Sequence, residues 1–370
     1  MQKPNPRFWK MPEAKMTDGS AVDQDSLLAG LLASAPPRLT PDQAHDLLRD
    51  HWWIDGSAIE IACERDQNFR IVTETGQGYI LKISNAVEDP LNTEFQTAAL
   101  RWVARVDPEL PLPRAVAALD GAFTQRLKLP SGRTSVVRVL SWLDGTPLHH
   151  VPMTAQMQSG IGAMTARLGR ALEGFDHPGA RHELLWDIQH LPRLRPLTES
   201  LGEDAVADAV RRELDHFEAQ VAPALGGLRR QVIHNDMNHH NILVDANEQD
   251  RITGILDFGD MVNTYLAIDV AVAASYLASE EDPLGAIARL VAAYHAVLPL
   301  EREEVELLRD LTVARLVASI TITNWRAARY PENAAYILRN NGPARMAMAR
   351  FATLPTQDVT RALLSACDME

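Results

Sequence analysis

Two polar segments close together in the chain constrain its fold more than any other feature: His234-Asn-Asp236-Met-Asn-His-His-Asn241 and Asp257-Phe-Gly-Asp260. Transfer of a phosphoryl group from a nucleotide needs a carboxylate that orients the acceptor hydroxyl and oxygen ligands that hold Mg²⁺ against the phosphates. Asp236, Asn241 and Asp257 can fill these roles. Asp and Asn also favour ordinary turns, so the plainer interpretation is a polar turn between core strands. The joint spacing of the three residues favours the first interpretation.

The residues around these segments predict that the three side chains converge. Residues 231–233 are typical of a short buried strand that leads into the loop, and residues 241–245 and 252–256 are typical of a hairpin. Asn241 begins one hairpin strand and Asp257 follows its antiparallel partner. Both side chains are therefore expected at the same end of the hairpin, beside the loop that carries Asp236.

With these motifs the chain resembles the aminoglycoside phosphotransferase and choline kinase family, whose fold is similar to that of the protein kinases. The resemblance covers roughly residues 55 to 330 and rests on H-x-D-x-x-x-x-N followed by D-F-G. It implies that Asp236 is the catalytic base, that Asn241 and Asp257 bind Mg²⁺, and that His234 supports the loop. Asn235 stands where the family usually has Gly. Because Asn tolerates positive φ, the loop is expected to keep its shape.

The resemblance implies an α+β, two-lobed protein-kinase-like fold, with a small and mainly antiparallel β lobe and a larger, mainly helical lobe. We expect a mobile N-terminal extension over residues 1–25 and a nucleotide-binding lobe over residues 26–143. Residues 144–370 are expected to carry the catalytic loop, the metal site and the substrate pocket. The phosphoryl donor would be ATP or GTP.

Sequence patterns indicate the small lobe. Thr40-Pro-Asp-Gln43 predicts a capped helix that runs to about Trp53, and residues 69–74 and 79–83 predict two strands. Alternation along the second strand places Lys82 on the face opposite Leu81, where a phosphate could lie. Taken alone, Lys82 could equally be a solvated strand lysine.

A helix that begins after Asp89 is expected to turn its apolar stripe, Leu91, Phe95, Ala98 and Trp102, toward the sheet. Glu94 lies at the edge of this stripe. In the family a lysine on the strand pairs with a glutamate on this helix, so the resemblance implies an ion pair between Lys82 and Glu94.

Other nucleotide contacts are expected in two connecting segments. The segment Glu64-Arg-Asp-Gln-Asn68 contains no glycine. The resemblance implies that it forms a polar loop over the phosphates, in which Gln67 and Asn68 contact the nucleotide; a plain hairpin loop is the alternative. The turn-rich stretch after residue 140 resembles a hinge, where backbone groups from Leu140 to Leu143 would meet the base.

The remainder of the chain predicts helices over residues 154–175, 203–221, 267–278, 284–298, 303–328 and 333–352. Asp269 lies within an apolar run, where an unpartnered carboxylate would be costly. The resemblance implies that it holds the catalytic loop by hydrogen bonds. The pairs His149-His150 and His239-His240 suggest a metal site. Neither pair has a suitably spaced partner in sequence, so substrate-side or solvent-exposed histidines are favoured.

Composition limits the partners and the compartment. The formal net charge of −13 disfavours nucleic acid and anionic membranes and favours amine-bearing small molecules. Cys63 and Cys367, the only cysteines of the chain, are far apart in sequence, which fits a reducing cytoplasm. No window has the length of a transmembrane helix. A homodimer is left open.

Within the family, Asp236-Met-Asn-His-His-Asn241 followed by Asp257-Phe-Gly-Asp260 is most similar to the hydroxylysine kinase branch. That resemblance implies a small-molecule kinase acting on an amino alcohol or hydroxy amino acid. Asp260 would accept the substrate ammonium, unless it caps the next helix. The alternatives are an antibiotic phosphotransferase for aminoglycosides or macrolides and a non-catalytic nucleotide-binding module. Further candidates for the substrate pocket are Asn238, His240, Asn324 and Trp325.

Overall fold

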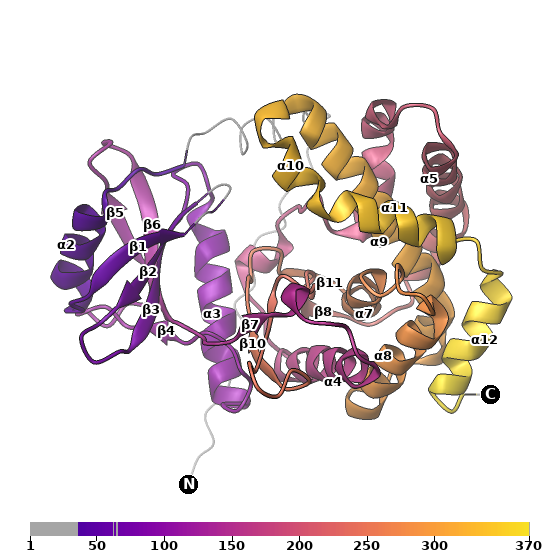
Figure 1. The fold of residues 1–370 in the computed structure, drawn as a ribbon, viewed down its shortest axis with the longest axis horizontal. Helices are drawn as coiled ribbons and strands as arrows, with labels where there is room; N and C mark the ends of the chain where they lie inside the picture. Colours follow the sequence, from indigo (N-terminus) through magenta and orange to yellow (C-terminus); the bar gives the residue numbers. More distant parts are fainter. Residues whose placement is uncertain (1–35, 62, 64–65, 370) are drawn as a thin grey trace, which may run out of the picture.

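The protein is described by a computed structural model covering residues 36–61, 63 and 66–369. Figure 1 shows a small lobe of strands with one helix on its outer side, and a larger helical lobe. The two lobes expected from the sequence are therefore present. The predicted N-terminal extension lies outside the described residues.

The small lobe is built on a mainly antiparallel sheet in the order β1-β2-β3-β6-β4, with β5 paired to β6. One sheet face packs on α2 through a core that includes Leu48, Phe69, Leu81 and Val139. Helix α2 begins as predicted, because Thr40 and Gln43 form a capping box and Pro41 occupies the first turn. The elements are α2 (Pro41–Trp52), β1 (Ser57–Ile61), β2 (Gln67–Val72), β3 (Gly78–Ile83), α3 (Pro90–Val106), β4 (Ala115–Val116), β5 (Gln125–Lys128) and β6 (Thr134–Ser141).

The large lobe surrounds the very apolar helix α7, in which every residue is buried. Two small antiparallel sheets, β7-β9-β10 and β8-β11, lie beside these helices and carry the catalytic segments. The elements are β7 (Thr146–Pro147), α4 (Ala155–Ala171), α5 (Ala205–His216), α6 (Ala222–Leu225), β8 (Arg230–Ile233), β9 (Ile242–Val244), β10 (Ile252–Ile255), β11 (Val262–Tyr265), α7 (Leu266–Ser275), α8 (Pro283–Val297), α9 (Arg302–Arg329), α10 (Ala334–Ile337), α11 (Asn341–Arg350) and α12 (Thr356–Ala366).

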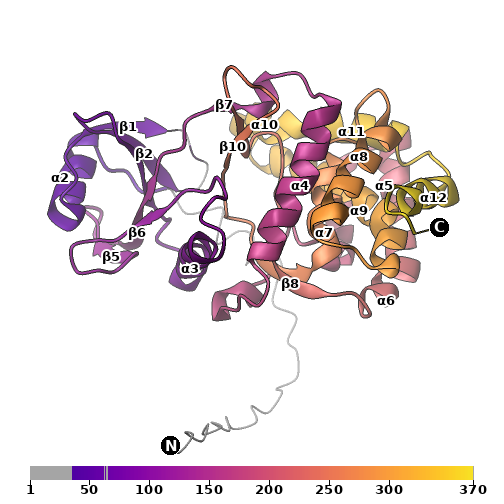
Figure 2. The ribbon, with the colours of Figure 1, turned by 90° about the horizontal axis from the view of Figure 1, so that it is seen from below.

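Helix α3 lies between the small-lobe sheet and the large lobe, as Figures 1 and 2 show. The prediction that its apolar stripe faces the sheet is wrong. Phe95 stacks on Phe175 with ring centroids 6.1 Å apart, and the Trp102 indole donates to the carbonyl of Ala171 at 2.9 Å. The stripe packs on the large lobe because that lobe supplies aromatic and apolar partners, while polar side chains of α3 face the sheet.

Two further expectations about elements need correction. Residues 333–352 do not form one helix: the chain breaks into α10 and α11, with a short 3₁₀ turn at Leu338–Asn340 before Gly342 and Pro343. The helix α12 was not predicted. None of the helices among the described residues has the length and apolar character needed to span a bilayer.

Candidate active site

The loop between β8 and β9 is held by buried side chains. His234, fully buried, lies with Nε2 3.1 Å from the carbonyl oxygen of Leu256 and accepts from the Asp236 backbone N–H at Nδ1. The Asn235 backbone N–H donates to Asp269 Oδ1 at 2.8 Å. Asn235 has φ of +62°, as expected for the position where a Gly is usual. The predicted supporting contacts of His234 and Asp269 are therefore present.

Asp236 is clamped from two sides. The Asn241 amide donates to Asp236 Oδ2 at 2.7 Å, and Arg315 Nη2 donates to Oδ1 at 3.1 Å. Burial raises the pKa of Asp236 and the nearby Asp257 adds to this, whereas Arg315 lowers it. The carboxylate is 19 % exposed. It is thus oriented and still reachable from solvent.

Asn241 and Asp257 come to the same end of the β9-β10 hairpin, as the antiparallel pairing of Ile242 with Ile255 requires. Since the Asn241 amide nitrogen is directed at Asp236, its oxygen is left to face elsewhere. Asp257 is exposed, has φ of +55°, and one of its oxygens accepts from the Gly259 N–H at 3.1 Å.

This donor set fits Mg²⁺, which is commonly bound through one or two carboxylates together with substrate phosphates. No group of three or more His, Cys, Asp or Glu side chains converges on a metal position within the described part of the chain. A Mg²⁺ site made of Asn241, Asp257 and two phosphate oxygens does not need three such side chains.

Lys82 lies in the middle of the small-lobe sheet, opposite Asn68 in β2 and Arg138 in β6. Among the described residues no ion pair joins Lys82 to Glu94, so this pairing stays a prediction. Arg138 instead links the sheet to α3, donating to Thr97 Oγ1 at 2.9 Å and also to Gln96. Burial lowers the pKa of Arg138 to about 10.

The predicted polar loop is shorter than expected, because Gln67 and Asn68 lie in β2 and are buried. The Gln67 side-chain amide accepts from the Leu39 backbone N–H and donates to the Leu39 carbonyl and to Glu60 Oε1. These bonds give Gln67 a structural role, while its contact with a nucleotide stays a prediction. Residues 64 and 65 lie outside the described residues.

In the hinge, Leu140 belongs to β6 and is buried. The Trp142 backbone N–H is already used by the Gly78 carbonyl at 3.0 Å. Leu143 packs against β10, where its Cδ1 would lie 3.2 Å from a Cβ placed on Gly254. The contact of the backbone from Leu140 to Leu143 with a nucleotide base stays a prediction.

The two histidine pairs, which are not spaced for a metal site in sequence, pack together in space. The His149 ring lies 3.9 Å from that of His150 and 4.3 Å from that of His240, and the His149 N–H donates to the His239 carbonyl. The pairs meet because the segment after β7 folds onto the catalytic loop, and within the described part of the chain they do not form a metal-binding group.

The remaining substrate candidates fall into two groups. Asn238 and His240 belong to the catalytic loop, where the Asn238 side chain accepts from the His240 N–H at 2.7 Å. Asp260 precedes β11 and does not cap α7, whose first residue follows Tyr265. The Asn324 side-chain amide donates to the Ile320 carbonyl of the same helix, α9, at 2.8 Å. The Arg329 guanidinium lies over the Trp325 ring. Asn324 follows Arg315 by about two and a half helical turns, which places it on the opposite face of α9.

The most informative residue that sequence reasoning missed is Arg315. It is 2 % exposed, its guanidinium covers the Trp186 ring at 4.8 Å, and it donates to the Trp186 carbonyl at 3.2 Å. A buried arginine inside the apolar pattern of α9 is the only sequence signal that could have suggested it, since a buried charge requires a partner.

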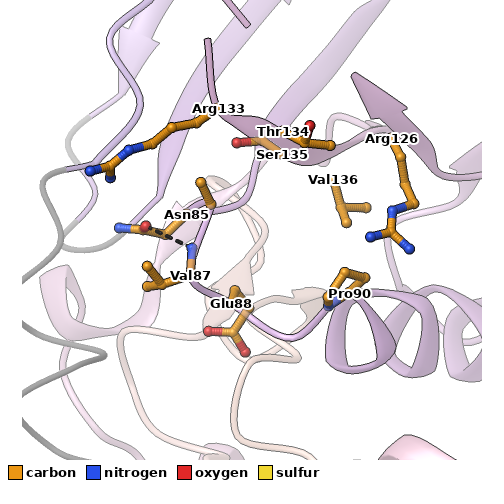
Figure 3. A pocket seen from close by; sticks show the side chains of 10 residues that line it. Asn85, Val87, Glu88, Pro90, Arg126, Arg133, Thr134, Ser135 and Val136 are labelled. Carbon is orange, nitrogen blue, oxygen red and sulfur yellow. Dashed lines mark hydrogen bonds between the residues drawn. The ribbon is translucent and has the colours of Figure 1, made fainter. Parts of the chain in front are cut away.

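A separate cavity of about 400 Å³ lies in the small lobe, between the start of α3 and strands β5 and β6 (Figure 3). Asn85, Glu88, Arg126 and Arg133 are among the residues that line it. None of the predicted catalytic or metal-binding residues belongs to its lining.

Known proteins resemble the chain over most of its length. Hydroxylysine kinase from Mus musculus is 28 % identical over 83 % of this chain and 87 % of its own, and a homoserine kinase from Azorhizobium caulinodans is 28 % identical over 66 % and 73 %. Among solved structures, an amicoumacin kinase superposes with a TM-score of 0.61 at 14 % identity, covering 91 % of this chain and 97 % of that one. The last likeness supports the kinase-like fold.

A model of the phosphotransferase enzyme family matches residues 59–308, which include β3, the catalytic loop and the hairpin. Sequence motifs, lobe arrangement and loop geometry agree with this match. The chain therefore belongs to the phosphotransferase enzyme family (APH).

Proposed function

We propose that this protein is a small-molecule kinase that transfers the γ-phosphoryl group of ATP or GTP to the hydroxyl of an amino alcohol or hydroxy amino acid similar to hydroxylysine. The observation that carries the proposal is the clamped Asp236 carboxylate beside Asn241 and Asp257. The names of the relatives, hydroxylysine kinase and homoserine kinase, support an amino-acid-sized acceptor.

In this mechanism Asp236 orients the acceptor hydroxyl and takes its proton. A carboxylate is well suited to this role when its lone pairs are held in one direction, and Arg315 and Asn241 supply that constraint through the two oxygens. Solvent access to Asp236 is limited, which favours the acceptor over water as the attacking group.

Asn241 and Asp257 would hold Mg²⁺, which when bound neutralises the charge on the β- and γ-phosphates. Lys82 would contact the phosphates from the sheet, with Glu94 as its predicted partner. Asn68, across from Lys82 on β2, and the backbone near Leu143 are the further nucleotide contacts that we propose.

Asp260 would bind the ammonium group of the acceptor. Asp260 acts electrostatically on both Tyr276 and Arg315, as Asp236 does, which supports this assignment. Asn238, His240, Asn324 and Trp325 stay candidates for the acceptor pocket.

The proposal is tested by measuring the release of nucleoside diphosphate with each candidate acceptor. The acceptors are 5-hydroxylysine, homoserine, ethanolamine and choline, and they are compared with a panel of aminoglycosides. We expect 5-hydroxylysine or a similar small amine to give the highest kcat/KM. A preference for aminoglycosides would instead identify an antibiotic phosphotransferase. If the protein binds nucleotide but releases no nucleoside diphosphate with any acceptor, it is a non-catalytic nucleotide-binding module.

A further inference from the structure

Two arginines lie near the catalytic loop, although the chain carries a formal net charge of −13. Arg326 lies near the end of α9 and Arg339 follows α10, and burial together with Arg339 lowers the pKa of Arg326. In Figures 1 and 2, α10 lies at the end of the large lobe that faces the small lobe.

The segment after α10 contacts the catalytic loop directly. His240 Nε2 lies 3.1 Å from Asn340 Oδ1, and the His239 and His240 rings are 4.3 Å apart. The His239 ring meets Tyr276 edge to face at 5.6 Å, and Tyr276 acts electrostatically on Arg315, the partner of Asp236. A chain of neighbouring side chains therefore leads from Asp236 to residue 340.

Arg339 is exposed and yet held in place. Its Nη1 donates to the Tyr336 carbonyl at 2.9 Å, and its guanidinium lies 3.9 Å from the centroid of the Tyr336 ring. Within the described part of the chain it forms no ion pair with a carboxylate. A pre-positioned guanidinium without a counterion is suited to bind a carboxylate through two N–H groups.

The imidazoles of His239 and His240 lie near this guanidinium. Both side chains are half-buried, and Arg339 acts electrostatically on each of them. The His240 ring is held in place by its contact with Asn340.

We propose that Arg339, with His240 beside it, binds the carboxylate of the acceptor, so that this enzyme prefers hydroxy amino acids over the amino alcohols that lack a carboxylate. The inference rests on the proposed function and narrows its substrate class. We assign the nucleotide phosphates to another place, because their proposed contact Lys82 belongs to the small-lobe sheet and the proposed Mg²⁺ ligand Asp257 lies at the hairpin end. Asp260 and Arg339 would together recognise a zwitterion.

Matched acceptors that differ only in the carboxylate test this inference. We compare kcat/KM for 5-hydroxylysine with 1,5-diaminopentan-2-ol, and for homoserine with 3-aminopropan-1-ol. The wild-type protein is expected to prefer the amino acid of each pair by about tenfold or more. Arg339→Gln should remove most of this preference by raising KM for the amino acid alone, and Arg339→Lys should restore part of it.

Arg361→Gln is the matched control, since Arg361 is an exposed arginine in α12 that pairs with Asp358. It should leave both kcat/KM values unchanged. Equal use of both members of each pair, or an unchanged preference in Arg339→Gln, would overturn the inference and leave the kinase function intact. Phosphorylation of neither member would overturn both the inference and the proposed function.

Discussion

At the scale of single residues, the site depends on how a buried carboxylate keeps its charge. Burial raises the pKa of Asp236, and Arg315 from α9 opposes this through a contact of 3.1 Å. Because Arg315 also donates to the Trp186 carbonyl, its guanidinium is held on two sides. The contact therefore holds the Asp236 carboxylate in one direction and favours its charged form.

Arg315→Met should reduce kcat by roughly tenfold to a hundredfold, since it removes the partner that orients Asp236. Arg315→Lys should retain part of the activity because it keeps a positive charge. Breaking a buried pair also destabilises a protein by about 3–5 kcal/mol, so the folded fraction of each variant is measured by circular dichroism. Full activity in folded Arg315→Met would remove Arg315 from the site.

Asp257→Ala should weaken Mg²⁺-nucleotide binding by about tenfold or more and abolish transfer, because Asn241 is a neutral ligand and Mg²⁺ favours carboxylate oxygens. Titration calorimetry with and without Mg²⁺ measures this. Asp260→Asn is the matched control and should affect only the acceptor KM. Unchanged Mg²⁺-nucleotide affinity in Asp257→Ala would place the metal elsewhere.

Sequence spacing predicted the residues that act within one loop and hairpin, because local strand geometry is enough to bring Asp236, Asn241 and Asp257 together. It could not predict Arg315 or Arg138. Each reaches its partner from another element, 79 residues from Asp236 for Arg315 and 41 residues from Thr97 for Arg138. Such contacts depend on which side of a helix points toward which neighbouring element. The spacing of apolar residues does not determine this for very apolar helices such as α7 and α9.

At the scale of elements, α3 connects the lobes. Its apolar stripe packs on the large lobe, and Asp107 at its C-terminal end forms two bonds with Arg167 of α4, at 2.6 and 2.7 Å. The helix position that the sequence predicted was correct, whereas its orientation was not. The stripe shows only that α3 has an apolar face, and both lobes offer apolar surface to cover it.

Asp107→Asn should lower the free energy of unfolding by about 1–2 kcal/mol near pH 7. The Arg167 bond lowers the pKa of Asp107 in the folded protein, so this stabilisation is present above the unfolded pKa of about 4. The stabilisation is lost as the pH falls through the lower pKa that Asp107 has in the folded protein. The free energies of unfolding of wild type and Asp107→Asn, measured in urea, should therefore differ at pH 7. They should converge at the most acidic pH at which both proteins remain folded.

Asp176→Asn provides the control for that experiment. Asp176 and Arg181 form an ion pair in which both side chains are 62 % exposed. Removing such a pair should change the free energy of unfolding by less than about 0.5 kcal/mol. An equal effect of both variants would contradict a special role for the contact between α3 and α4.

At the scale of the whole molecule, net charge and the chemistry of one pocket are separate properties. The net charge of −13 predicted an amine-bearing substrate, and the contact that we propose for Arg339 beside the catalytic loop adds a place for an anion. Net charge is a sum over the surface and says little about one pocket. The two-lobed fold was predictable because its motifs are local, while the acceptor pocket is assembled from segments far apart in sequence.

The central claim is that Asp236 takes the proton of an acceptor hydroxyl during phosphoryl transfer. The most direct test is rapid-quench measurement of phosphorylated 5-hydroxylysine formed by wild type and Asp236→Asn, with nucleotide affinity measured by calorimetry. We predict that Asp236→Asn binds Mg²⁺-nucleotide as wild type does and forms product on the order of a hundredfold more slowly or less. Product formation at the wild-type rate would contradict the account.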